Sequence, residues 1–317
     1  MSCSFDAAIL FSGDQKKAKE TLLSLQEGAV RPGKILILCT ENEADSLAEA
    51  KGDAEIVPLP ARDRGLFMAQ AIRRTDAPFL LILTDASGKL SDDFAAGLLR
   101  HFEEEPACEI AFSAAFKKNK ASSLPKAFYD ALYTVCPAFG KEQIYTFGPQ
   151  LFMRDLGAAM FRRDLLTVCP PEVGALTKPE RILTARAVYR DGKVALDQEL
   201  RTEECFRLNP SSEFHDAFSF SAARRLYYQT FGIGFRMHKK MKGKGFTENP
   251  VLKTSMGKAY GRAGRKAAGT LLKHGAFYKI PYLFLIVLSA KLGESLGGWY
   301  HRFPAALNRH LAGNRYF

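Results

Sequence analysis

Polar residues that could contact a ligand follow two of the apolar runs in the first third of the chain. Asp85 and Ser87 follow one such run, and Thr40 and Glu41 follow an earlier one. Compact apolar runs are typical of strands in mostly parallel sheets, and such sheets bind ligands at the carboxyl ends of their strands. These residues are therefore candidate ligand contacts. Asp, Ser and Gly also favour turns, so the first two could be turn residues and the other two loop residues.

The elements that must position these residues alternate between strand and helix. Compact apolar runs predict strands at residues 5–11, 34–38, 55–59, 79–83, 108–116 and 193–200. Apolar residues at helical spacing or helix-end signals predict helices at residues 14–26, 66–74, 92–105 and 178–190. A basic loop is predicted at residues 117–126, and the signal is weak from 127 to 145. This alternation predicts an α/β fold, a mostly parallel sheet flanked by helices.

Composition limits the class of protein. A chain of 317 residues that is 47% hydrophobic can bury one large core, or a core with a smaller appendage, which excludes disorder throughout. The six cysteines are scattered without a C-x-x-C pair, and no basic and apolar signal precedes them. We therefore expect a reducing, cytoplasmic setting in which the cysteines are packing residues.

The positive net charge belongs to the C-terminal third. Residues 211–317 hold 18 Lys and Arg against four Asp and Glu, whereas residues 1–210 hold 27 against 30. Such a basic segment could meet nucleic acid, anionic lipid or a phosphorylated substrate. Apolar residues at 277–290 accompany the charge, and this mixture favours lipid headgroups. The apolar run at 280–288 is shorter than the roughly 18 residues that span a bilayer, so no transmembrane helix is predicted.

Residues 277–292 allow two interpretations. They could pack as a core helix against the rest of the protein, or they could lie in a membrane interface. Tyr282, Trp299 and Tyr300 lie near Lys and Arg in the sequence, and such amphipathic side chains favour headgroup depth. We therefore expect an anionic membrane surface as a partner of this segment.

Four stretches in order resemble glycosyltransferase family 2, in particular its bacterial rhamnosyltransferases. Residues 14–26 (DQKKAKETLLSLQ) are similar to the family's first helix, and residues 64–72 (RGLFMAQAI) lead to 80–87 (LLILTDAS), which resembles the segment ending in its D-x-D motif. Residues 157–164 (GAAMFRRD) and 178–183 (KPERIL) resemble the acceptor-side strand and helix. Residues 215–232 and the terminal stretch 281–304 are similar to the helical tail of the rhamnosyltransferases.

The resemblance implies a GT-A fold and an inverting transfer of a sugar from a nucleotide-diphosphate donor. It divides the chain into a GT-A catalytic-type domain at residues 1–218 and a basic amphipathic helical extension at 219–317. The implied nucleotide-sugar-binding residues are Ser12, Thr40, Glu41, Gly65, Asp85, Ser87 and Arg162. Gly65 could instead only permit a tight turn, and Arg162 could be solvated charge.

The resemblance also implies a divalent cation, Mg²⁺ or Mn²⁺, held by the D-x-D carboxylates. Asp85 and, weakly, His215 are its candidate ligands, although His215 could be an ordinary surface residue. Ser87 replaces the second Asp, and a hydroxyl is a poor substitute for an anionic ligand. We therefore expect either a low affinity for the cation or its replacement by basic side chains, for which Lys89 is one candidate.

The implied catalytic base is Glu180. The family's E-D pair reads Glu180-Arg181 here, and a guanidinium cannot act as a base near neutral pH. Glu180 can serve if its carboxylate faces the sugar. An acidic residue in a first helical turn is also favoured by the helix dipole whatever its function.

Three functions follow from these observations. The first is an active glycosyltransferase with a glycan or lipid-linked acceptor, peripheral at the cytoplasmic face of the cell membrane. The second is a non-catalytic GT-A-fold protein that serves as a binding or scaffold partner in glycan assembly, suggested by Ser87 and Arg181. The third, a nucleic-acid-binding protein, is disfavoured because the sequence has no recognised nucleic-acid module.

Overall fold

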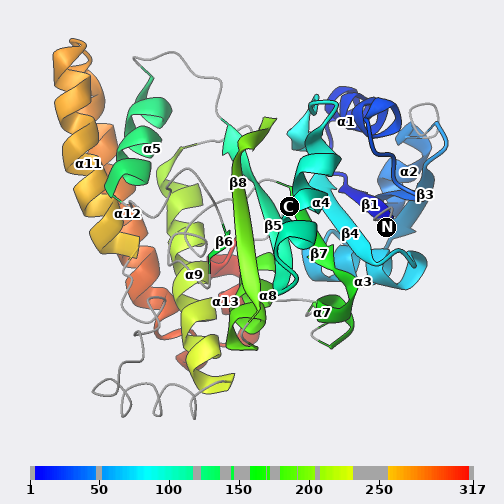
Figure 1. The fold of residues 1–317 in the computed structure, drawn as a ribbon. Helices are drawn as coiled ribbons and strands as arrows, with labels where there is room; N and C mark the ends of the chain where they lie inside the picture. The colour runs from blue at the N-terminus through cyan, green and yellow to red at the C-terminus, as the bar shows by residue number, and fades with distance from the viewer. Residues whose placement is uncertain are drawn as a thin grey trace, which may run out of the picture.

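The computed structural model describes most of the chain as a central sheet flanked by helices. The described residues are 4–47, 52–116, 123–135, 144–145, 158–168, 170–171, 179–190, 192–203, 208–230 and 256–313. A group of C-terminal helices lies beside the end of the sheet that is far from β3 (Figure 1).

Eight strands in the described residues form one mixed sheet in the order β3-β2-β1-β4-β7-β5-β8-β6. Strands β3, β2, β1 and β4 are parallel neighbours, and β5 is parallel to β8. Strand β7 runs antiparallel between β4 and β5, and β6 is antiparallel to β8. The strands are β1 (Phe5–Leu10), β2 (Ile35–Thr40), β3 (Glu55–Leu59), β4 (Phe79–Thr84), β5 (Cys108–Phe116), β6 (Ile144–Tyr145), β7 (Ala159–Arg162) and β8 (Lys193–Glu203). The predicted mostly parallel α/β sheet is confirmed.

Helices cover both faces of the sheet. On one face, Leu22 and Leu98 pack in one apolar cluster with Ile9 of β1. On the other face, Phe67 and Leu183 belong to a second cluster with the opposite residues of the same strands. The helices on the first face are α1 (Gln15–Glu27) and α4 (Phe94–Glu104), and those on the second are α3 (Arg64–Arg74), α7 (Arg163–Val168) and α8 (Pro179–Tyr189). Because both faces are covered, the strands are apolar throughout, which is the pattern that the sequence displays.

Helices α2, α5 and the short α7 were not predicted. Helix α2 (Glu41–Leu47) has one buried residue, Leu47, so it lacks the periodic apolar face by which a helix is recognised. Helix α5 (Leu124–Val135) begins inside the stretch expected to be a basic loop. Its buried Phe128 packs against Tyr260, which is distant in sequence, with ring centroids 5.1 Å apart.

The C-terminal helices form a core of their own. Helices α5, α9, α11 and α12 bury one apolar cluster that includes Phe220 and Ile286. The C-terminal elements are α9 (Pro210–Thr230), α11 (Met256–Lys273), η3 (Phe277–Lys279), α12 (Ile280–Gly297), η4 (Tyr300–Arg302) and α13 (Ala305–Leu311). The predicted domain boundary after residue 218 falls inside α9 and does not coincide with a break in the structure. The basic stretch at residues 257–266 lies inside α11.

Helix α12 is longer than the apolar run on which the expectation about membrane-spanning segments was based. By length and composition alone, Phe277–Gly297 could cross a bilayer, and 28% of its most apolar window is buried. The prediction was based on the apolar run at 280–288 alone, whereas the helix continues through small residues to Gly297. One face of α12 packs in the core through Leu283 and Ile286, and the other exposes Leu285 and Leu288. One face of the helix therefore belongs to the core, and the other is apolar and exposed.

Candidate functional site

The carboxylate of Asp85 joins the carboxyl ends of β1 and β4. Strand β1 lies parallel to β4, with Leu10 beside Thr84, so the residues that follow both strands meet. The Asp85 carboxylate accepts hydrogen bonds from the backbone N–H of Ser12 (3.0 Å), the Ser12 hydroxyl (2.5 Å) and the backbone N–H of Asp14 (2.9 Å). Asp85 is fully buried. Two predicted site residues, Ser12 and Asp85, are thus brought together.

A short 3-10 helix, η1 (Asp85–Ser87), carries the segment away from the strand. It ends at Gly88, whose φ of 63° lies in the left-handed region that favours glycine. The Gly88 carbonyl accepts a hydrogen bond from the Thr21 hydroxyl of α1 at 2.9 Å. Ser87 is buried in this turn and Lys89 is exposed beside it. The residues after β4 therefore form a turn, and the same strand end also carries the polar contacts of Asp85.

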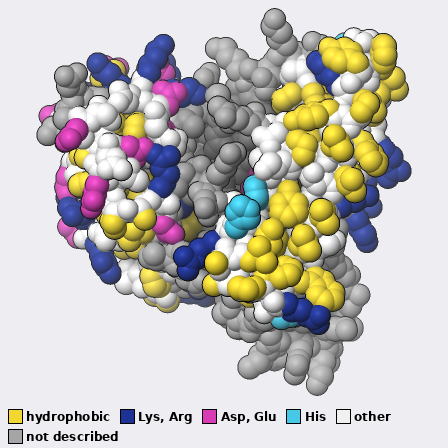
Figure 2. Space-filling model, turned by 180° about the vertical axis from the view of Figure 1, so that it is seen from behind, with side chains coloured by type: hydrophobic (Ala, Val, Ile, Leu, Met, Phe, Trp, Pro, Cys, Tyr) yellow, Lys and Arg dark blue, Asp and Glu magenta, His cyan; other side chains and the backbone are white. Residues whose placement is uncertain are grey.

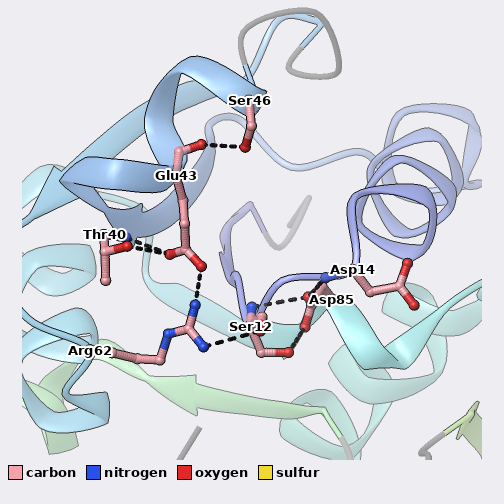
Figure 3. Close-up of polar contacts among 7 residues, drawn as sticks. All are labelled: Ser12, Asp14, Thr40, Glu43, Ser46, Arg62 and Asp85. Atoms are coloured by element: carbon pink, nitrogen blue, oxygen red, sulfur yellow. Dashed lines mark hydrogen bonds and ion pairs between the residues drawn. The ribbon is translucent and has the colours of Figure 1, made fainter.

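A second chain of contacts crosses the carboxyl edge from β2 to β1 (Figure 3). The Glu43 carboxylate of α2 accepts hydrogen bonds from the Thr40 backbone N–H (2.9 Å) and the Thr40 hydroxyl (2.6 Å). Its other oxygen is paired with the guanidinium of Arg62. Arg62 also donates to the Ser12 carbonyl at 3.2 Å. Arg62 is thereby held between two strand ends, with its side chain 35% exposed.

Glu180 lies at the start of α8 and is paired with Arg64 at the start of α3. The Arg64 Nε and Nη2 atoms lie 2.6 and 2.5 Å from Glu180 Oε1. Both side chains are buried, at 9% and 7% exposure. The second oxygen, Oε2, is buried and has no hydrogen-bond partner among the described residues. A buried carboxylate oxygen without a partner can accept a hydrogen bond from a ligand.

Gly65 is the second residue of α3, next to Arg64. It is buried, and the helix is capped by Asp63, whose carboxylate accepts from the Leu66 N–H at 2.7 Å. Since α3 follows β3, both residues lie at the carboxyl edge of the parallel strands. Gly65 therefore occupies an ordinary position in a helix, which favours a local structural role.

One predicted residue of this edge, Glu41, does not join the contacts around Thr40 and Arg62. Glu41 is exposed in the first turn of α2, so Glu43 is the acidic residue that turns toward Thr40 and Arg62. The alternation of apolar and polar residues could not reveal this, because it depends on a seven-residue helix that has no apolar stripe.

Arg162 lies at the opposite edge of the sheet. It pairs with Phe79, the first residue of β4, whereas Asp85 follows the last, so about 17 Å of strand separates them. Its guanidinium donates to the carbonyl oxygens of Cys108 (3.1 Å) and Pro106 (3.2 Å). The structure therefore places Arg162 in a structural role, away from Ser12 and Asp85.

His215 lies in helix α9 and not in a polar loop. Its Nδ1 donates to the backbone carbonyl of Leu311 at 2.8 Å, and its Nε2 lies 3.2 Å from the Ser211 hydroxyl. Gly313, at a φ of 72°, packs directly against the ring. The Nδ1 contact links α9 to the C-terminal helix α13, whereas the Nε2 contact lies within α9.

No group of three or more His, Cys, Asp and Glu side chains that could hold a metal ion occurs in the described parts of the chain. Both oxygens of Asp85 already accept hydrogen bonds, and His215 is committed to Leu311. The two predicted ligands therefore do not form a metal site with described neighbours. The side chain of Arg181 lies outside the described residues.

The described cysteines are packing residues, as expected. Cys39 and Cys108 are free and buried. Burial raises the pKa of each thiol to about 11, with Glu43 adding to the shift at Cys39. Such thiols stay protonated near neutral pH and are poor nucleophiles. The cysteines outside the described residues are Cys3, Cys136, Cys169 and Cys205.

Comparisons with known proteins identify the fold. No protein-family model and no curated protein sequence matches the chain. Among solved structures, the mannosyltransferase PcManGT from Pyrobaculum calidifontis, in complex with GDP-Man and Mn²⁺, is similar with a TM-score of 0.58 and 13% identity over 94% of this chain and 88% of that one. TarS residues 1–349 from S. aureus has a TM-score of 0.48 and 10% identity, over 94% and 91%. At this identity the first likeness shows the fold, which is of the GT-A type.

Proposed function

We propose that this chain is an inverting glycosyltransferase that transfers a sugar from a nucleotide-diphosphate donor to a cell-surface polysaccharide or glycolipid acceptor. The observation that carries the proposal is the joined set of contacts from Thr40 through Glu43, Arg62 and Ser12 to Asp85, located where parallel strands end. Ligands of open α/β sheets bind at such edges. Rhamnose is the first sugar to test, because of the likeness in residues 215–232 and 281–304.

In this proposal Arg62 binds the diphosphate. A guanidinium is suited to phosphate oxygens because it is planar, permanently charged and rich in donors. Glu43 positions Arg62, and Asp85 fixes the loop after β1 on which the donor would rest. Lys89, exposed in the neighbouring turn, is the second candidate cation.

Glu180 is the proposed base. The acceptor oxygen would form a bond to the anomeric carbon while the bond from that carbon to the diphosphate oxygen breaks, and the hydroxyl proton would pass to Glu180 Oε2. That oxygen is the one without a described partner, whereas Oε1 is held by Arg64. Arg64 is therefore a positioning residue in this scheme.

A divalent cation is used by other proteins of this fold, as the Mn²⁺ in the PcManGT complex illustrates. The described residues here do not fit a resident cation, since both oxygens of Asp85 already accept hydrogen bonds and Ser87 replaces a carboxylate. We therefore assign neutralisation of the diphosphate to Arg62 and Lys89 and derive no step through a metal.

Isothermal titration of the full-length protein with UDP, GDP, CDP and dTDP, with and without Mg²⁺, tests the donor site. We expect at least one nucleotide to bind, and Arg62→Gln to weaken its binding tenfold or more. Arg74→Gln is the matched control, because Arg74 pairs with Glu55 at the amino edge of β3 (2.7 Å). Absence of binding by all four nucleotides, or equal loss in both variants, would contradict the proposal.

A non-catalytic role as a binding or scaffold partner is the second candidate. Two observations favour it. Both oxygens of the Asp85 carboxylate already accept hydrogen bonds, and the described side chains include no group of three or more that could hold a metal ion. Turnover of nucleotide sugars, including dTDP-rhamnose, separates the two candidates. Transfer or donor hydrolysis that is lost in Glu180→Gln supports the enzyme, whereas nucleotide binding without turnover supports the scaffold.

We place the protein at the cytoplasmic face of a membrane, on anionic lipid. Large apolar side chains gather over the C-terminal helices, with Lys and Arg along the margin of this face (Figure 2). Leu285, Leu288 and Leu292 of α12 are each at least half exposed. Flotation with anionic vesicles should be lost in Leu285→Ser/Leu288→Ser, and a parallel shift assay should detect no nucleic-acid binding.

A further inference from the structure

A groove of about 540 Å³ runs between helices α11 and α12. This volume falls within the range of small-molecule sites. Its apolar surface comes mainly from α12 through Leu283, Phe284 and Val287. Its rim carries basic side chains, three from α11 and Lys291 from α12. The groove therefore combines an apolar wall with a basic rim.

Glycines on α11 create the space. Gly257, Gly261 and Gly264 all line the groove. A Cβ at Gly264 would lie 2.8 Å from Val287 Cγ2, so the helices approach closely there. At Gly261 the nearest atom to such a Cβ would be Lys291 Cε at 3.8 Å, so the groove is open at that point.

Three cations of the rim have no anionic partner among the described residues. Arg262, Arg265 and Lys291 make no ion pair with any described residue, and all three are exposed. The nearby carboxylate of Glu294 accepts a hydrogen bond from the Gly257 N–H at 2.7 Å, at the end of the groove. Unpaired cations around a concave apolar surface attract an anion that carries apolar mass.

The groove adjoins the exposed apolar face of α12. Phe284 lines the groove and is 65% exposed, so it belongs to both. A free phosphate would leave this surface in water, and a neutral hydrocarbon would leave the cations without a partner. A ligand with a phosphate at one end and a hydrocarbon chain at the other uses both.

We propose that the α11–α12 groove binds one anionic amphiphile. Its phosphate lies among Arg262, Arg265 and Lys291, and its hydrocarbon chain lies along Leu283 and Phe284. This site is separate from the proposed nucleotide site, and its test requires no nucleotide sugar.

Titration of the full-length protein with monomeric probes tests the site. The probes are dodecyl phosphate and dihexanoylphosphatidylglycerol, both below their micellar concentrations, with inorganic phosphate and a neutral dodecyl ether as controls. We expect one-to-one binding of at least one amphiphilic phosphate, at least tenfold tighter than either control. Preference for the single-chain monoester points to a lipid-phosphate substrate, and preference for the diester to bilayer phospholipid. Equal affinity for a control overturns the proposal.

Charge variants test the phosphate contacts. Arg262→Gln/Arg265→Gln should weaken binding tenfold or more, while Lys266→Gln/Lys273→Gln should not. The second pair removes the same charge from exposed positions of the same helix that do not line the groove. Equal weakening in both double variants would mean general electrostatic attraction and would overturn the site.

A space-filling variant tests the chain-binding surface. Gly261→Leu should abolish amphiphile binding and keep or raise the thermal unfolding midpoint, because Leu has a higher helix propensity than Gly. Gly269→Leu is the control, since a Cβ there meets nothing within 4 Å and Gly269 lies outside the groove. Unchanged binding in a folded Gly261→Leu protein overturns the proposal.

Discussion

The backbone N–H of Asp14 donates a hydrogen bond of 2.9 Å to the carboxylate of Asp85, 71 residues further along the chain. Asp14 is also the N-cap of α1, where its own carboxylate accepts from the Lys17 N–H. One buried carboxylate therefore fixes the loop after β1 and the start of the helix that covers one face of the sheet.

Replacement of Asp85 should destabilise the protein as well as impair nucleotide binding. Asp85→Ala leaves the partly buried Ser12 and Asp14 N–H groups without their acceptor, which costs about 3 kcal/mol. Asp85→Asn keeps one acceptor oxygen and should cost less. Urea unfolding measures both. A change below about 0.5 kcal/mol for Asp85→Ala would show that the hydrogen bonds accepted by Asp85 contribute little to stability.

Arg64 and Glu180 should be strongly coupled. Removal of one member of a buried pair costs roughly 3–5 kcal/mol, whereas removal of both can be nearly neutral. We expect Arg64→Met and Glu180→Met to be costly separately and the double variant to cost far less than their sum. Unfolding free energies of the four proteins give the coupling.

The exposed pair Arg74 and Glu55 is the matched control for that cycle. Its side chains are 46% and 36% exposed, and exposed pairs contribute about 1 kcal/mol or less. Additive costs for Arg64 and Glu180, resembling those of this control, would contradict the buried coupling.

Gly293→Ala should separate α12 from α9. A Cβ at Gly293 would lie 2.2 Å from the backbone carbonyl oxygen of Phe214, which cannot move aside like a flexible side chain. We expect a loss of about 3 kcal/mol, at the upper end of overpacking costs. Gly298→Ala, whose Cβ would lie 3.4 Å from its nearest neighbour, should change the unfolding free energy little. Similar effects of the two substitutions would argue against close helix packing.

The stability contributed by Asp197 should fall in acid. Burial alone would raise the pKa of Asp197, but hydrogen bonds from His101 and from the Glu199 and Leu200 N–H groups outweigh it and hold the pKa below its ordinary value of 3.8. The folded state thus favours the carboxylate, so its stabilisation is present above that value and is lost as pH falls through the lower, folded pKa.

Unfolding free energies of the wild type and Asp197→Asn between pH 6 and pH 2.5 check this. The difference between them should be constant near neutral pH and shrink below about pH 4. A difference that grows on acidification would mean that the folded pKa is raised. Arg100, 3.7 Å from Asp197, is 56% exposed and should affect the result mainly at low salt.

Local sequence determined the strands and most of the helices around the sheet. Residues 79–83 read as a covered strand because both faces of β4 are buried, so its apolar pattern needs no knowledge of neighbours. Helix α1 likewise carries its own cap at Asp14 and its own apolar stripe. Helix α2 was not predicted, because its position depends on contacts of Glu43 and Leu47 and not on a periodic apolar face.

Only the tertiary structure decided which polar side chains meet. Sequence could place Asp85 and Arg162 in one list of ligand contacts, but the antiparallel course of β7 sends Arg162 to the other edge of the sheet. It could not pair Glu180 with Arg64, 116 residues away. Strand direction and helix packing set these distances, and both depend on burial summed over the whole core, whereas periodicity and capping act within a few residues along the chain.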